Sequence, residues 1–251
     1  MTGGPDRFAE PDIFAVIDGT WPAARLWRDG VWTLREGRGG GSRVSAATLS
    51  GPPEAAAQPD AIAAAEAAMR GIGQHPIFMI RPGEQTLDAA LAARGYARVD
   101  PVIAYACPVA QLTDLDLPRV RVFHIWEPLA IMYDIWRAGG IGPARWAVMD
   151  RAPGPKTGLL ARFNDKPGGA GFVAIHQGAA MVHALEILPH QRRQGLGQWM
   201  MRGAAFWARD NGADWLTVMC TEANAGANGL YSSLGMREVA RYHYRRAPEE
   251  D

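Results

Sequence analysis

The stretch Leu185-Glu186-Ile187-Leu188-Pro189-His190-Gln191-Arg192-Arg193-Gln194-Gly195-Leu196-Gly197 joins a predicted strand, 180–188, to a long predicted helix, 193–211. The strand ends at a proline, and a basic polar turn with two glycines opens the helix. The first turn of a helix has unpaired backbone N–H groups and carries about half a positive charge. Glycines let an anion approach that backbone closely, and two arginines add charge beside it. The stretch therefore predicts a pyrophosphate-binding turn.

Two common phosphate-binding motifs do not fit this turn. A kinase-type loop ends in Gly-Lys-Ser or Gly-Lys-Thr, and the chain has neither. The dinucleotide fingerprint needs a third glycine where Met200 stands, and Asp214 precedes a strand instead of ending one. What remains is the pattern Arg-x-x-Gly-x-Gly, formed by Arg192, Gly195 and Gly197.

This pattern, with a second one downstream, resembles the GNAT superfamily of acyl-CoA-dependent N-acyltransferases. The second pattern is Asn224-x-x-Ala227-x-x-Leu230-Tyr231-x-x-Leu234-Gly235-Met236, one strand and one helix further on. The resemblance covers roughly residues 120–246. It implies acetyl-CoA as cosubstrate and transfer of its acetyl group to a primary amine by direct attack in a ternary complex.

The resemblance also implies which residues form the site. The strand before the turn would splay from its neighbour, bind the pantetheine arm through the backbone at Leu185 and Ile187, and present a backbone N–H near Ile187 to the thioester carbonyl. Asn224 would supply a polar contact at its helix start, and Tyr231 occupies the position of the family's general acid. Their i, i+7 spacing places them on one helix face. The implied pyrophosphate contacts are Arg192, Arg193, Gln194, Gly195, Leu196 and Gly197.

The group that deprotonates the amine is left open between several candidates. Glu186 is the best one, directly or through water, but strand alternation sets it opposite Leu185 and Ile187, which equally suits a structural salt bridge. His183, on the same strand, is a weaker candidate. Cys220 is better interpreted as a small buried thiol than as a nucleophile. No group of His, Cys and carboxylates has metal-ligand spacing, so we expect no metal.

Aromatic residues gather in the segment that forms the substrate-side wall in this family. Two interpretations stay open: an aromatic pocket for an apolar or cationic acceptor, or an ordinary hydrophobic core. The residues concerned are Trp126, Tyr133, Trp136 and Trp146.

The two halves of the chain resemble each other at a constant offset of 140 residues, set by Gly95 and Gly235. In each half a strand, a loop and a helix precede that glycine, and another strand follows. We therefore expect an α/β fold of two GNAT-like domains, each a mixed, mostly antiparallel twisted sheet flanked by helices. The N-terminal domain, 1–112, would be degenerate and the C-terminal domain, 113–251, catalytic.

The first half lacks the chemistry of the second. Glu84 stands where Asn224 is, Leu91 where Tyr231 is, and no Arg-x-x-Gly-x-Gly occurs there. We expect this half to bind no CoA and to close the acceptor cleft. Further predictions for it are a helix start at Thr20-Trp21-Pro22, a glycine-rich hairpin joining strands at 31–36 and 43–50, and a loop at 50–58.

Composition limits the partners. The 251 residues include 26 basic and 26 acidic side chains, so no net charge attracts nucleic acid or an anionic membrane. Two cysteines are too few for a disulfide framework, no apolar run reaches the roughly 20 residues of a membrane span, and the start Met1–Asp6 lacks a signal pattern. We expect a cytoplasmic enzyme acting on a small-molecule or peptide amine, with acceptor and oligomeric state open. The alternative is a non-catalytic acyl-CoA-binding sensor or scaffold.

Overall fold

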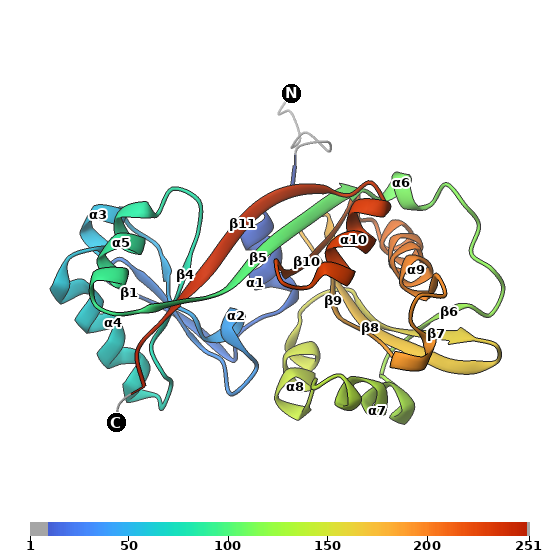
Figure 1. Ribbon diagram of the computed structural model, residues 1–251, viewed down its shortest axis with the longest axis horizontal. Helices are drawn as coiled ribbons and strands as arrows, with labels where there is room; N and C mark the ends of the chain where they lie inside the picture. The colour runs from blue at the N-terminus through green and yellow to red at the C-terminus, as the bar shows by residue number, and fades with distance from the viewer. Residues whose placement is uncertain (1–9, 250–251) are drawn as a thin grey trace.

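The computed structural model describes residues 10–249 (Figure 1). The chain start inspected for a signal pattern, Met1–Asp6, lies outside them. Two sheets with surrounding helices make the α/β fold that the sequence predicts. No helix within the described range is long and apolar enough to cross a bilayer.

The strands form one small and one large sheet, with the orders β1-β2-β3 and β4-β11-β5-β10-β9-β8-β7-β6. In the large sheet β9 and β10 pair in parallel and the other neighbours pair antiparallel, which confirms the predicted mixed, mostly antiparallel sheet. The strands are β1 (Arg25–Asp29), β2 (Trp32–Glu36), β3 (Thr48–Leu49), β4 (Ile77–Ile80), β5 (Ala97–Pro108), β6 (Val122–Ile125), β7 (Lys156–Phe163), β8 (Lys166–His176), β9 (Ala179–Ile187), β10 (Trp215–Thr221) and β11 (Arg237–Arg246).

Helices cover both faces of the large sheet. α9 packs over β6 to β10 on one face, and α7 packs over β8 and β9 on the other. The helices are α1 (Ile13–Thr20), α2 (Ser42–Ser45), α3 (Pro53–Ala56), α4 (Pro59–Gly71), α5 (Gln85–Ala93), α6 (Val109–Leu112), α7 (Ala130–Ala138), α8 (Pro143–Arg151), α9 (Leu196–Asp210) and α10 (Ala225–Ser233), with a 3₁₀ turn η1 at Pro189–Gln191.

Three local predictions were wrong. α1 ends at Thr20, where we expected a helix to begin, because Asp12 caps an earlier start by accepting the N–H of Phe14 at 3.0 Å. Ser42–Ser45 is a helical turn where a strand was expected, and only Thr48–Leu49 of that segment is strand. The expected loop at 50–58 contains the helical turn α3.

The helix α9 begins at Leu196, three residues later than predicted. Arg193 has φ 62° and Gly195 has φ 76°, so both lie in the left-handed region and neither continues a right-handed helix. Residues 192–195 are therefore an exposed turn between η1 and the helix.

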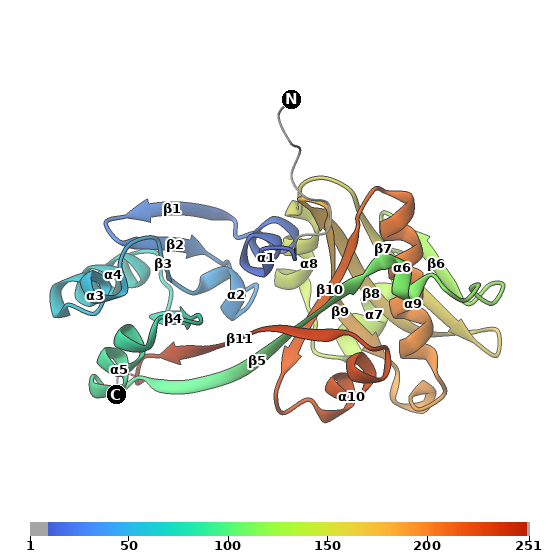
Figure 2. The same ribbon diagram turned by 90° about the horizontal axis from the view of Figure 1, so that it is seen from above.

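The halves exchange their last strands. β5, from the first half, pairs with β10 of the second, while β11 returns to pair with β4. The two long strands β5 and β11 run from one lobe to the other, and β11 ends in the lobe built from N-terminal residues (Figures 1 and 2). The strand registers repeat at the 140-residue offset. Cys220 pairs with Ile103, and their equivalents Ile80 and His243 pair with each other.

A side-chain hydrogen bond repeats at the same offset. Tyr105 on β5 donates its hydroxyl to Asn228 Oδ1 at 2.9 Å, and Arg245 on β11 donates Nε–H to Asp88 Oδ1 at 2.7 Å. Each bond ties an exchanged strand to the helix of the other half. This repetition supports a duplication, while the division at 112/113 stays a prediction.

Candidate active site

A cleft of about 1060 Å³ opens where β9 and β10 separate. The two strands pair only from Ala179 and Trp215 to Val182 and Val218. Beyond these pairs β9 runs on to Ile187 and β10 to Thr221 without pairing to each other. The gap between them gives a ligand access to the backbone edge of β9, as the splayed strand of the resemblance requires.

A bulge on β9 shapes this edge. Ala184 has φ 49°, and two residues of β9 stand opposite one residue of β8 at this point. The bulge shifts the alternation, so that Leu185 and Ile187 pack toward α9 while Ala184 packs toward α7. Trp136 of α7, fully buried, donates its indole N–H to the Ala184 carbonyl at 2.9 Å. This bond fixes the bulge from the opposite face of the sheet.

The turn after β9 presents unpaired backbone donors. Among the described residues, none of the backbone N–H groups from Arg193 to Gln198 has a hydrogen-bond acceptor. Arg192 is held by donating Nε–H to the Ile187 carbonyl at 2.9 Å. The cleft is lined by each predicted pyrophosphate contact except Gln194, whose side chain donates to the His190 carbonyl instead. Such a row of N–H groups suits a diphosphate.

Tyr231 lines the same cleft. It is 3% exposed on α10, its ring centroid is 5.5 Å from that of Tyr105, and its hydroxyl makes no hydrogen bond within residues 10–249. Burial raises the pKa of the phenol above its ordinary value. Asn224, also at the cleft, caps α10 by accepting the N–H of Ala227 at 3.1 Å.

Asn228 holds this corner together, and our sequence analysis missed it. Its Oδ1 accepts the Tyr105 hydroxyl and the Cys220 thiol at 3.1 Å, and its Nδ2 donates to three carbonyls of the β10–α10 connection. Asn228 occupies one of the unassigned positions of the second pattern. Its equivalence to Asp88 is a signal that could have revealed it.

Residues 125–236 match the model of the acetyltransferase (GNAT) family. These residues form a GNAT acetyltransferase domain. Over 235 residues the chain is 25% identical to an uncharacterised N-acetyltransferase, YobR, of Bacillus subtilis (strain 168), and the match covers 90% of this chain and 94% of that protein. Family and relative together support N-acetyltransferase activity in general.

Solved structures show the same fold over most of the chain. A GCN5-related N-acetyltransferase from Kribbella flavida superposes with a TM-score of 0.71 at 20% identity, covering 95% of both chains. A tandem GNAT protein from the clavulanic acid biosynthesis pathway superposes with a TM-score of 0.59 at 14% identity, covering 88% of this chain and 79% of that one. The predicted fold class and family resemblance are confirmed.

Within the GNAT domain, Glu186 has a salt-bridge partner. Its carboxylate lies 3.0 Å from Arg192 Nη2 and packs against Gly139, where a Cβ would collide with it. The sequence left two interpretations of Glu186 open, a base and a structural salt bridge, and the structure contains the salt bridge. Glu186 also lines the cleft, and its role as a base stays a prediction.

His183 is buried and fully hydrogen-bonded. Arg43 Nη1 lies 2.9 Å from Nδ1, and because a guanidinium can only donate, Nδ1 accepts. Nε2 therefore carries the proton of the neutral ring and donates to Thr20 Oγ1 at 2.8 Å, while that hydroxyl donates to the Val16 carbonyl. Burial, with the nearby Arg43 charge, holds the pKa of His183 well below its usual value. This ring offers no lone pair to an acceptor amine.

His183→Gln is expected to reduce the loss of stability in mild acid. The folded-state pKa is depressed, so the unfolded chain binds the extra proton and the wild type loses stability as pH falls below about 6.5. One such proton costs about 1.4 kcal/mol between pH 7.5 and pH 5.5. Glutamine can keep both hydrogen bonds without titrating. Urea unfolding at the two pH values measures the difference, and an equal loss in both proteins would contradict the assignment.

Cys220 is half-buried and lines the cleft, so it is less enclosed than the small buried thiol that we expected. Burial raises its pKa to about 11, so the reactive thiolate is scarce at neutral pH. The Cys220 thiol donates a hydrogen bond to Asn228 Oδ1.

None of the four aromatic residues of the predicted substrate-side wall lines the cleft: Tyr133, Trp136 and Trp146 belong to a core cluster, whereas Trp126 is exposed. Trp136 is buried, Tyr133 packs on Trp146 with ring centroids 4.7 Å apart, and the Trp146 indole donates to the Ile141 carbonyl. Trp21, from the first half, is the tryptophan that lines the cleft. The aromatic-pocket interpretation named the wrong residues, because the wall is completed by a part of the chain distant in sequence.

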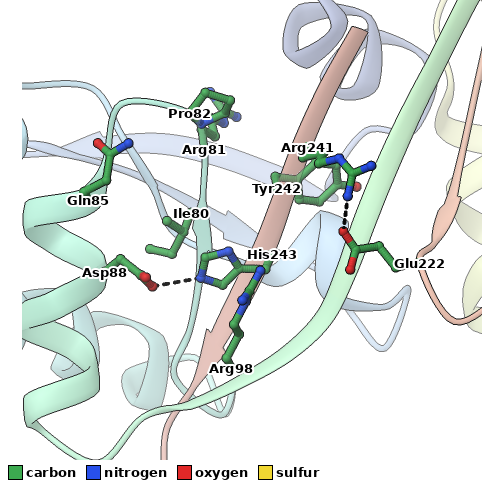
Figure 3. A pocket seen from close by; sticks show the side chains of 10 residues that line it. All are labelled: Ile80, Arg81, Pro82, Gln85, Asp88, Arg98, Glu222, Arg241, Tyr242 and His243. Atoms are coloured by element: carbon green, nitrogen blue, oxygen red, sulfur yellow. Dashed lines mark hydrogen bonds and ion pairs between the residues drawn. The ribbon is translucent and has the colours of Figure 1, made fainter. Parts of the chain in front are cut away.

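A second cavity, about 280 Å³, lies between β4, α5 and β11 (Figure 3). The 140-residue offset makes its residues Ile80 and Asp88 equivalent to Cys220 and Asn228. Its acids are paired: Asp88 with His243 at 2.8 Å and Glu222 with Arg241 at 2.6 Å. No counterpart of the glycine turn adjoins it among the described residues.

Proposed function

We propose that the protein transfers an acetyl group from acetyl-CoA to a primary amine by direct attack in a ternary complex, with Tyr231 as general acid. One juxtaposition carries this proposal: the unpaired N–H groups of the turn and the phenol of Tyr231, which has no hydrogen-bond partner among residues 10–249, line one cleft. The N–H groups of the turn can bind an anion, and the Tyr231 phenol can donate a proton.

The residues present fit acetyl-CoA. The turn at 192–197 suits its diphosphate, and Gly197 lets the start of α9 pack closely on α10, since a Cβ there would lie 3.0 Å from Leu230. The backbone of β9 beyond the bulge suits the amide groups of the pantetheine arm. When bound, the cosubstrate supplies an acetyl group activated as a thioester.

The chain's own groups account for the proton balance. The attacking amine must be neutral and loses one proton as its nitrogen–carbon bond forms, while the departing sulfur needs one. Tyr231 stays protonated at neutral pH, because burial keeps its pKa above the ordinary value of about 10. It can share its proton with the sulfur as the carbon–sulfur bond breaks. Glu186, directly or through water, is our candidate to accept the proton of the amine.

We also propose that residues 1–112 bind no CoA. Leu91 is fully buried at the position of Tyr231 and carries no proton. Glu84 stands at the position of Asn224 and accepts the backbone N–H of Arg81 at 2.8 Å, so an acid replaces the amide there and its charge would repel a nearby diphosphate. This half instead supplies Trp21 and Arg43 to the cleft of the other.

Thermal shift followed by thiol release tests the proposal. Acetyl-CoA at about 100 times its Kd should raise Tm by about 5 °C or more, and some amine of a broad panel should then release CoA thiol. Stabilisation without release for any amine would instead favour an acyl-CoA-binding sensor. An unchanged Tm would overturn both readings of the cleft.

A further inference from the structure

Arg43 and Arg145 line the cleft, and neither has an acidic partner among residues 10–249. We propose that Arg43 and Arg145 bind the carboxylate of the acceptor, so that the acceptor is a small amine that also carries a carboxylate, such as a free amino acid. This inference rests on the proposed acetyl transfer and names its substrate class.

Arg43 is held in place yet keeps donors free. Its guanidinium stacks 5.0 Å from the Trp21 ring, and its Nη1 donates to His183 Nδ1 at 2.9 Å and to Met219 Sδ at 3.5 Å. Nε and Nη2 donate to no group within residues 10–249, and Arg43 forms no ion pair there. A half-buried guanidinium fixed on one side and unpaired on the other is built to meet an anion.

Arg145 lines the same cleft as Arg43. It lies on α8, and its Nε and Nη2 lie 3.8 Å from the position that a Cβ on Gly41 would take, two residues before Arg43. It is exposed and makes no hydrogen bond or ion pair with the rest of the described chain. The two guanidinium groups thus come from the two halves of the chain and line one cleft.

The position along β9 separates these arginines from the diphosphate site. Arg43 is bound to His183, whereas the turn follows Ile187, four residues further along β9, a distance of at most about 13 Å. The bulge at Ala184 lies between. The diphosphate at the turn would engage Arg192 and Arg193, so Arg43 and Arg145 remain for the other substrate.

The charge of the cleft favours such an acceptor. Among its described lining residues are four arginines and one acid, Glu186, which is paired with Arg192. Guanidinium groups bind carboxylates in a planar, two-bond geometry. The same positive charge lowers the pKa of a nearby amine and so favours the neutral nucleophile. Polyamines would bring several like charges to these arginines.

Matched substrates test the inference. Thiol release is measured with amino acids, with the primary amides of the same amino acids, and with spermidine. We expect kcat/KM to be about 10-fold or more higher for the free acids than for the amides, the effect of a charge-assisted contact. Arg145→Gln should bring this ratio below about 3-fold, chiefly through KM of the acid.

Arg28→Gln, an exposed arginine on β1, makes the same charge change away from the cleft and should leave the ratio as it is. Equal use of acids and amides, preference for spermidine, or an undiminished ratio in Arg145→Gln would overturn the carboxylate site while acetyl transfer stands. Release with none of these compounds but with another amine of the broad panel would overturn this inference alone. Release with no amine at all, despite acetyl-CoA binding, would overturn the inference together with the proposed function.

Discussion

Replacing Tyr231 by Phe is expected to lower kcat about 100-fold while acetyl-CoA affinity changes little. The phenol is buried, lines the cleft and has no hydrogen-bond partner within the described chain, so its proton is available for the departing sulfur. Loss of a positioned general acid typically costs 10²-fold or more. Stopped-flow or steady-state thiol release gives kcat, and calorimetry gives the affinity.

Tyr105→Phe is the matched control. The ring centroids of Tyr105 and Tyr231 are 5.5 Å apart, but the Tyr105 hydroxyl already donates a hydrogen bond to Asn228. Its removal should cost about 1 kcal/mol of stability and only a few-fold in kcat. A drop as large as that of Tyr231→Phe would assign the effect to packing of this corner, and wild-type turnover in Tyr231→Phe would place the acid elsewhere.

The pH dependence adds a second readout. Because burial raises the pKa of Tyr231, its donor form persists to higher pH than that of an exposed tyrosine. The ratio of kcat between wild type and Tyr231→Phe should therefore stay constant from pH 6 to pH 9. A ratio that collapses toward one below pH 9 would show that another group supplies the proton.

The parts of this fold that local sequence specifies were predictable. The strands Ile77–Ile80 and Trp215–Thr221 are short apolar runs between turn residues, and the turn before α9 carries its arginines and glycines in one continuous segment. Alternation correctly set Glu186 opposite Leu185 and Ile187, since the bulge lies just before them.

The parts that depend on tertiary pairing were not predictable. The 140-residue offset predicts a duplication, but nothing in the local sequence says that β5 pairs with β10 and β11 with β4. For the same reason Trp21 and Arg43 could not be placed in a cleft whose other lining residues all follow residue 140. The left-handed Arg193 also departs from its residue type's preference, so the start of α9 was set too early.

Gly195→Asp is expected to weaken acetyl-CoA binding by about 100-fold or more. Gly195 lies in the turn with φ 76°, and its Cβ position has no neighbour within 4 Å, so a side chain there would extend into the cleft. At about 5 Å, one unit charge repels another by roughly 3 kcal/mol at an effective dielectric constant near 20, enough for that loss. Calorimetric titration with acetyl-CoA measures it.

Gly195→Asn separates charge from shape. Asparagine has the same size and tolerates the left-handed backbone about as well as aspartate, so both variants share the cost of leaving glycine. An acid at a helix N-terminus is itself favourable for folding, so the Asp variant should unfold at no lower temperature than the Asn variant. A large gap in affinity beside equal or higher stability can then come only from repulsion of a bound anion. Equal affinities in the two variants would mean that the diphosphate binds somewhere other than this turn.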